Sequence, residues 1–251
     1  MPSPARVVLS APGQKNACGH GWSDSASGAE VRFLGRGAPP QTPLAELVAP
    51  GLAEGVRPSW LRQVHGAAVL EAQPGLCGSG DALTCVGEDL ALVVVTADCV
   101  PVLLAGGRRI AAVHAGWRGI VAGVVSASVS QFAPRVEWLT AWIGPAIGAC
   151  CYEVGEEVAG QVERAAHGAE CVLRRLPRPH LDLRAAVEAQ LAAAGVDEIR
   201  HLDLCTRCHP DLLWSYRRDG PRAGRNLAWI VRPPADAAGC ADRHAETPTR
   251  S

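Results

Sequence analysis

Residues 90–119 constrain the fold of this chain more than any other stretch, because they combine two long apolar runs with a central pair of glycines. The runs on either side of Gly106 and Gly107 are rich in Val, Leu, Ile and Ala, the composition expected of buried strands joined by a tight turn. The stretch therefore predicts a β-hairpin in the core, around which the rest of the chain is organised.

The register of this hairpin decides whether two candidate metal ligands meet. If Gly106 and Gly107 are the two loop residues, Cys99 lies directly opposite His114, with Cβ atoms about 4.5–5.5 Å apart. A four-residue loop sets His114 opposite Pro101, and Cys99 is then its diagonal neighbour, provided both side chains point to the same face. In either case a thiolate and an imidazole are close enough to share one metal ion.

The sequence at the end of the hairpin favours an anion-binding site. The second run ends in the sequence AGWRG at residues 115–119, and a helix-compatible segment follows it. A strand that leads through glycines into a helix presents backbone N–H groups and the positive end of the helix dipole. A thiolate, an imidazole and an anion site are therefore predicted close together in the sequence.

Length, charge and cysteine content narrow the class of protein. The chain has 251 residues, 48% of them hydrophobic, which suits a globular protein with a sizeable core. Its net charge of −1 gives no bias toward nucleic acid or membrane, so neither is expected as a partner. No apolar stretch resembles a signal peptide or approaches the ~18 residues of a membrane span. We therefore expect a cytoplasmic protein whose ten cysteines stay reduced.

The remaining segments predict an irregular alternation of strands and helices. Asp182 is a good N-cap for an apolar-faced helix, and Gly195 stands where that helix should end. The other expected helices run from Trp117 to about Phe132 and from about Glu156 to His167. Strands are expected at 6–9, 30–34, 59–70 (two strands), 136–143, 198–204, 214–220 and 224–230. This order favours a single mixed α/β (α+β) domain over residues 1–251, with flexible tails at 1–15 and 234–251.

Two cysteine motifs could indicate haem or metal binding. Cys205, Cys208 and His209 match the C-x-x-C-H pattern of covalent haem attachment, which we reject because the chain lacks an export signal. A zinc knuckle would need a second close pair of cysteines, and none has suitable spacing. The adjacent Cys150 and Cys151 cannot readily bridge each other without strain, so we expect a packing role for them.

Several motifs in a fixed order resemble the YfiH family, whose members have been described as multicopper polyphenol oxidases or laccases and as purine nucleoside phosphorylases. The motifs are QVHG, TADCVPVLL, HAGWRG, IGPAIGACCYEVG, SYRRDG and GRNLAWI, and they span about residues 59–231. Before residue 59 the chain departs from the family, since GHGWSDSASG stands where members usually carry Arg-Gly-Gly-Val-Ser. The resemblance implies a single four-layer α/β domain, grouped with the catalytic domain of cytotoxic necrotizing factor.

The resemblance also implies a metal ion held by His65, Cys99 and His114. It further implies phosphorolysis of adenosine, inosine and S-methyl-5′-thioadenosine, with adenosine deamination as a companion activity. Two imidazoles and one thiolate leave a fourth position for water, the composition of a catalytic zinc site, and copper is the other candidate metal. Zinc brings the pKa of a bound water toward neutrality, which suits hydrolysis at purine C6.

Phosphorolysis also needs a bound phosphate. Guanidinium groups match phosphate in a bidentate manner, which makes Arg118, Arg217 and Arg225 candidates for binding phosphate or ribose. Gln63, in the first motif, is a further candidate substrate contact. The expected partners are therefore a small nucleoside and phosphate, bound by a monomer or a small homo-oligomer.

Catalytic roles are predicted for Cys99, His114 and Asp98, with Asp98 and Glu153 as candidate proton carriers. A second interpretation makes Cys99 a nucleophile and His114 its base, in a cytoplasmic amidohydrolase that edits peptidoglycan precursors with this pair or with the metal. A non-enzymatic binding protein is disfavoured, because an open His/Cys site is an unusual feature for binding alone. Multicopper oxidase chemistry would need several copper sites, and the sequence displays one cluster of soft ligands.

Overall fold

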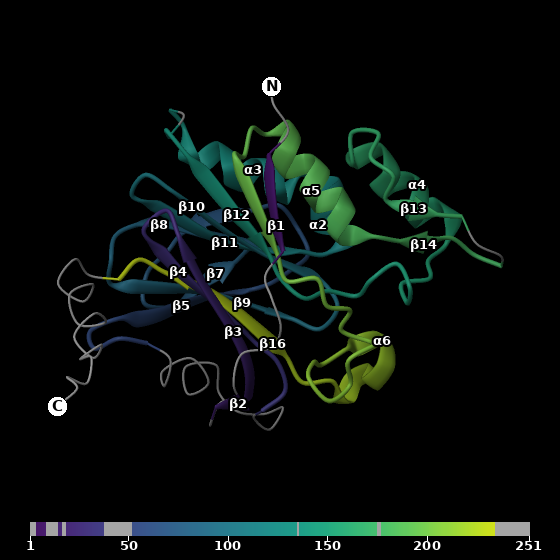
Figure 1. Cartoon of the computed structure of the whole chain (residues 1–251), viewed down its shortest axis with the longest axis horizontal. Coiled ribbons are helices and arrows are strands. Elements are labelled where there is room, and N and C mark those ends of the chain that lie inside the picture. Colours follow the sequence, from purple (N-terminus) through teal and green to yellow (C-terminus); the bar gives the residue numbers. More distant parts are fainter. Residues whose placement is uncertain are drawn as a thin grey trace, which may run out of the picture.

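The computed structural model describes residues 4–8, 15–16, 19–37, 52–134, 136–174 and 177–233. These residues form two seven-stranded mixed sheets with helices on one side (Figure 1). The mixed α/β class expected from the sequence is confirmed. None of the helices in the described ranges is long and apolar enough to cross a bilayer.

The first sheet contains both strands of the predicted hairpin at its centre. Its strands, in spatial order, are β1 (Ala5–Val8), β15 (Glu198–His201), β12 (Leu139–Ile143), β10 (Val100–Gly106), β11 (Arg109–Ala115), β8 (Ala82–Val86) and β6 (Val69–Glu71). Side chains of β10 alternate between two buried faces, which explains why its sequence is apolar throughout.

The second sheet packs face to face against the first. Its order is β2 (Lys15–Asn16), β3 (Gly19–Ala26), β4 (Ala29–Leu34), β16 (Asn226–Val231), β9 (Leu90–Thr96), β5 (Arg57–Arg62) and β7 (Gly75–Ser79). Phe33, Leu92 and Ile230 from this sheet meet Leu103 and Trp142 from the first in one buried cluster. A short ribbon of β13 (Val172–Leu173) and β14 (His180–Leu181) stands apart from both sheets.

Helices cover the other face of the first sheet (Figure 1). Val102, Leu104 and Val113 of the sheet pack there against apolar side chains of the helices. These helices are α2 (Trp117–Ala122), α3 (Val124–Val129), α4 (Glu156–Ala165) and α5 (Leu183–Ala193), and η2 (Ser130–Phe132) follows α3. The described residues thus account for three layers of the expected four.

The apolar run that the sequence presents as one strand is divided between the two sheets. β9 belongs to the second sheet and β10 to the first, and residues 97–99 connect them. Asp98 in this connection has a φ of 99°, a value that non-glycine residues rarely adopt. The crossing therefore places Asp98 and Cys99 where the sheets meet, outside both ladders.

The first of the two registers proposed for the hairpin is wrong. His114 pairs with Pro101 rather than Cys99, and Gly106 pairs with Arg109, so the turn consists of Gly107 and Arg108. Gly106 stays in the strand because β12 pairs on its other side, where a Cβ would lie 2.8 Å from Val136 and 3.0 Å from a backbone oxygen. The tight packing that requires this glycine is against the segment that leads into β12, not in the turn.

Other boundaries also differ from the prediction. The helix expected from Trp117 breaks at Gly123, which has a φ of 84°. Asp182 caps α5 as predicted, since its carboxylate accepts hydrogen bonds from the Arg184 and Ala185 N–H groups. The predicted strand after residue 214 is wrong, because Ser215 caps a short helix, α6 (Tyr216–Asp219), followed by η3 (Gly220–Arg222).

The expected tails fall mostly outside the described residues, including all of 234–251. Residues 5–8 of the N-terminal tail nevertheless form β1, which pairs in parallel with β15. The strand predicted near Arg6 is therefore confirmed.

Candidate active site

A cavity of about 570 Å³ gathers the candidate site residues, although they come from distant parts of the chain. Its walls include segments from both sheets, the start of α2 and the residues around α6. Eight of the nine residues singled out in the sequence as ligands, substrate contacts or catalytic groups line it, and Glu153 does not: Gln63, His65, Asp98, Cys99, His114, Arg118, Arg217 and Arg225.

The three predicted metal ligands form a compact group. His65 follows β5, Cys99 lies in the crossing between the sheets and His114 is in β11. His65 Nε2 is 3.9 Å from Cys99 Sγ, and the two imidazole rings meet edge to face with centroids 4.8 Å apart. The donor atoms of all three lie within 4.8 Å of one another.

Asp81 orients this group, and the sequence reasoning did not identify it. Its fully buried carboxylate accepts hydrogen bonds from His114 Nδ1 at 2.8 Å, His65 N at 2.9 Å and Gly66 N at 2.6 Å. The Nδ1 bond leaves His114 Nε2 directed at Cys99 and His65, the carboxylate–histidine arrangement that commonly supports a metal ligand. The backbone bonds hold His65 in a left-handed conformation, with a φ of 61°.

The protonation of these groups is strongly coupled. Burial by itself would raise the pKa of Cys99, but hydrogen bonds and charge from His114 and His65 outweigh it and lower this pKa to about 7. Burial would lower the pKa of His114, but Asp81 and Cys99 outweigh it and raise that pKa to about 9. Burial would also raise the pKa of Asp81, yet hydrogen bonds from His114, Gly66 and His65 lower it. Without a metal ion, the lowered pKa of Cys99 and the raised pKa of His114 therefore favour a thiolate–imidazolium pair.

The chemistry and spacing of these donors fit one metal ion. Gly116 lies against them: a Cβ there would come within 2.9 Å of the His65 ring and 3.1 Å of Cys99 Sγ. Two imidazoles and one thiolate form the ligand set of a catalytic zinc site with an open fourth position. The same set occurs with copper in electron-transfer sites, where a weak axial ligand is added.

Three arginines give the cavity a positive side. Arg118 is exposed, stacks over Trp117 at 4.4 Å, and makes no hydrogen bond or ion pair within the described residues. Arg217 donates to the Glu153 carbonyl and lies over the Tyr152 ring, 5.0 Å from its centroid. Within the described part of the chain, Arg225 donates hydrogen bonds to the backbone carbonyls of Ala223 and Gly224. The guanidinium group of Arg118 is thus fully available to an anion.

The side chains of two other candidates, Asp98 and Gln63, are already engaged in hydrogen bonds within the protein. Asp98 accepts hydrogen bonds from Thr206 Oγ1 at 2.5 Å and from Arg217 N at 2.7 Å, one on each carboxylate oxygen. The Gln63 amide bonds both the N–H and the carbonyl of Val95, joining β5 to β9. This geometry favours a positioning role for both residues over proton transfer or substrate binding.

Sequence reasoning missed two tyrosines in the cavity wall. Tyr152 and Tyr216 occur within recognised motifs, ACCYEVG and SYRRDG, but aromatic residues give no periodic signal of their own there. Burial, and next the charge of Cys99, raise the pKa of Tyr152 to about 12, so its hydroxyl stays protonated. Glu153, the other candidate proton carrier, lies next to Tyr152 and is exposed.

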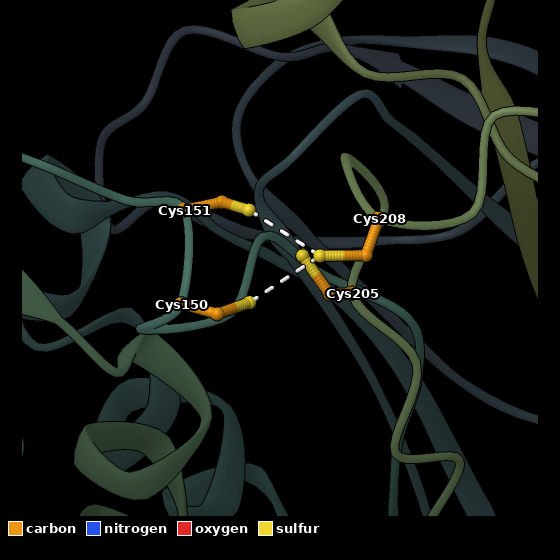
Figure 2. Close-up of side chains that lie close together, drawn as sticks. All are labelled: Cys150, Cys151, Cys205 and Cys208. Atoms are coloured by element: carbon orange, nitrogen blue, oxygen red, sulfur yellow. Dashed lines mark hydrogen bonds between the residues drawn. The ribbon is translucent and has the colours of Figure 1, made fainter.

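A second group of soft ligands contradicts the sequence-based expectation of a single cluster. Cys150 and Cys151 lie beside Cys205 and Cys208, and their four sulfurs are within 4.8 Å of one another (Figure 2). We refer to these four residues as the tetracysteine cluster. Cys150 and Cys151, for which a packing role was expected, are exposed and half-buried. They lie 54 residues before the C-x-x-C motif in the sequence, a separation that no local spacing rule could detect.

Comparison with known proteins identifies the family of this chain. The family described as multi-copper polyphenol oxidoreductase laccase matches residues 46–233, about three quarters of the chain. This chain belongs to that family, the YfiH family. It is 38% identical over 181 residues to a purine nucleoside phosphorylase of Pseudomonas aeruginosa, covering 69% of this chain and 74% of the relative. It is also 38% identical over 182 residues to purine nucleoside phosphorylase YfiH of Escherichia coli, covering 70% and 74%.

Two solved structures share the fold of this chain. The Neisseria meningitidis protein NMB0706 superposes with a TM-score of 0.74 at 26% identity, covering 85% of this chain and 99% of that one. YlmD from Geobacillus stearothermophilus gives a TM-score of 0.74 at 27% identity, covering 83% and 93%. The YfiH fold predicted from the motif order is therefore confirmed.

Proposed function

We propose that this chain is a zinc-dependent purine nucleoside phosphorylase that acts on adenosine, inosine and S-methyl-5′-thioadenosine and also deaminates adenosine. The observation that carries the proposal is one cavity lined both by a His/Cys/His donor group and by Arg118, which has no hydrogen-bond or ion-pair partner among the described residues. The names of the relatives at 38% identity support the same activity.

Phosphate is proposed to bind at the positive side of the cavity. Arg118 is its main ligand in this proposal, since no protein group competes for its guanidinium within the described residues. α2 has only six residues, so its dipole adds little beyond the side chain. Arg217 and Arg225 each retain donors that their backbone partners do not use, and these can contact phosphate or ribose.

The nucleoside is proposed to occupy the rest of the cavity, whose volume suits a small molecule. In phosphorolysis a phosphate oxygen attacks C1′ of the ribose while the glycosidic bond to the purine breaks. Adenosine and inosine then give ribose 1-phosphate and the purine base, and S-methyl-5′-thioadenosine gives the sugar 1-phosphate that keeps the 5-methylthio group. Tyr216, which is 54% exposed at the cavity wall, offers a ring face for the purine. The protonated hydroxyl of Tyr152 can donate a hydrogen bond to the substrate.

His65, Cys99 and His114 would hold the zinc ion. Zinc supplies a Lewis acid and an activated water nucleophile, the requirements for hydrolytic deamination at purine C6. Asp81 keeps the His114 imidazole oriented for this purpose and stabilises positive charge on it. Reduced cysteines are needed for such a site, which agrees with the proposed cytoplasmic location and with free thiols at the described cysteines.

The test is phosphate dependence. Purified protein is incubated with adenosine or inosine, with and without phosphate, and the products are separated by chromatography. We expect ribose 1-phosphate and free base only when phosphate is present. Arg118→Ala should raise the KM for phosphate at least tenfold, whereas Arg222→Ala, an exposed arginine in η3 outside the cavity, should leave it unchanged. Free ribose formed independently of phosphate would contradict phosphorolysis.

A cysteine amidohydrolase is the second candidate, favoured by the lowered pKa of Cys99 beside the raised pKa of His114. In that case a Cys99 thiolate would attack an amide carbonyl, as in the proposed editing of peptidoglycan precursors. Activity without metal, together with a trapped acyl group on Cys99, would establish this chemistry in place of phosphorolysis.

A further inference from the structure

The tetracysteine cluster joins two loops that are far apart in the sequence. Cys150 and Cys151 lie just before α4, and Cys205 and Cys208 lie after β15. Backbone hydrogen bonds already hold the loops together, with Ala146 N donating to Leu204 O and Thr206 N donating to Ala146 O. The cluster is thus built on a fixed backbone and not on a chance approach of mobile side chains.

The sulfur positions match a tetrahedral ion. Cys208 Sγ is 3.4 Å from Cys151 Sγ and 3.6 Å from Cys150 Sγ (Figure 2). Four thiolates around a zinc ion at about 2.3 Å stand about 3.8 Å apart along the edges of the tetrahedron. A disulfide needs about 2.05 Å between its sulfurs, and a single disulfide in this group would leave two of the four sulfurs without a partner.

We propose that Cys150, Cys151, Cys205 and Cys208 bind a structural zinc ion, separate from the His65/Cys99/His114 site. Four thiolates fill all tetrahedral positions, which leaves no open position for chemistry. Groups around the cysteines also suit a zinc–thiolate centre. Gly148 N donates a hydrogen bond to Cys205 Sγ at 3.3 Å, and Arg207 lies beside Cys151. The basic side chain offsets part of the excess negative charge of four thiolates on one divalent ion.

The zinc ion would fix one wall of the cavity. Tyr152, which lines the cavity, directly follows Cys151 in the chain. Thr206, between the other two ligands, donates to Asp98, and the Thr206 carbonyl accepts from Arg218 in α6. Linking the two loops through one ion therefore positions Tyr152 relative to Asp98 and α6.

The proposal does not rest on the proposed function, and it is tested by metal content of the full chain. Protein purified under reducing conditions is analysed for zinc by mass spectrometry. Cys150→Ser/Cys208→Ser should contain one zinc fewer per chain than the parent. Cys77→Ser removes a half-buried thiol outside both clusters and should keep the parental zinc content. Equal zinc in the parent and in a folded Cys150→Ser/Cys208→Ser protein would overturn the proposal.

A second measurement covers the case in which that variant does not fold. His65→Ala/His114→Ala leaves the tetracysteine cluster intact, so zinc X-ray absorption of this protein should show only sulfur neighbours at about 2.3 Å. A first shell that contains nitrogen or oxygen, loss of all zinc, iron in place of zinc, or a disulfide among these cysteines in the reduced protein would each refute it.

Discussion

Replacing Asp81 by asparagine tests whether the buried carboxylate supports the metal site. The asparagine side chain keeps the shape but loses the charge and one acceptor. If its oxygen faces His114 Nδ1 and His65 N, its NH2 group faces Gly66 N, where the carboxylate now accepts a bond of 2.6 Å. Two donors then oppose each other in a site that is 0% exposed.

Asp81→Asn should lower both the affinity for zinc and the free energy of unfolding. Loss of a carboxylate that supports a ligand histidine typically weakens metal binding about 10- to 100-fold, or about 1.4–2.7 kcal/mol. The lost charged hydrogen bond should lower the free energy of unfolding by about 2 kcal/mol. The pKa of Asp81 is lowered from 3.8 in the folded protein, so its stabilisation is present above pH 3.8 and disappears as the pH falls through the folded value. The difference between parent and variant should therefore be full at neutral pH.

The assay is zinc competition with a chromophoric chelator at pH 7, combined with chemical unfolding. Asp89→Asn is the matched control, because Asp89 is 59% exposed and pairs with Arg57 on the surface. A second readout is the alkylation rate of Cys99 in metal-free protein, which in the parent should rise through a pKa of about 7. In Asp81→Asn that midpoint should move toward the ordinary 9.0, because the His114 imidazolium loses its counter-charge. Unchanged zinc affinity and an unchanged midpoint would refute this account of the site.

Three further predictions concern the same cavity. Gly116→Ala should weaken zinc binding at least tenfold, because the added Cβ would press on His65 and Cys99. Gly155→Ala, where a Cβ meets open space, should bind zinc with the parental affinity. Equal zinc affinities of the two variants would argue against close packing of Gly116 on the metal ligands. Asp and His can both bind zinc, so Cys99→Asp or Cys99→His should keep metal and measurable phosphorolysis, whereas Cys99→Ala should lose most of both. Inactivity of both Cys99→Asp and Cys99→His would indicate that the Cys99 sulfur is a nucleophile. Iodoacetamide should label Cys99 slowly in zinc-loaded protein and faster after chelation, and mass spectrometry that finds rapid labelling of the loaded form would contradict thiolate coordination.

The sequence by itself determined the composition of the core and eight of the residues that line the candidate site. Apolar runs at 90–105 and 109–115 identified buried strands, because burial on both faces removes the polar alternation of a surface strand. The motif order placed Cys99 and His114 in one site with His65 and the arginines. The Asp182 cap was also readable, since capping is a local interaction.

Contacts between residues far apart in the sequence were decided only by the tertiary structure. The division of residues 90–105 between two sheets depends on which strands pair on each side, and it moves Cys99 out of the ladder to face His65. Asp81 became a ligand support only through a contact 33 residues away in sequence. The tetracysteine cluster needed the return of β15 beside β12, since parallel pairing of these strands brings residues 205–208 next to residues 150–151. Such contacts are set by the packing of whole sheets, so their chemistry becomes visible only when the chain is folded.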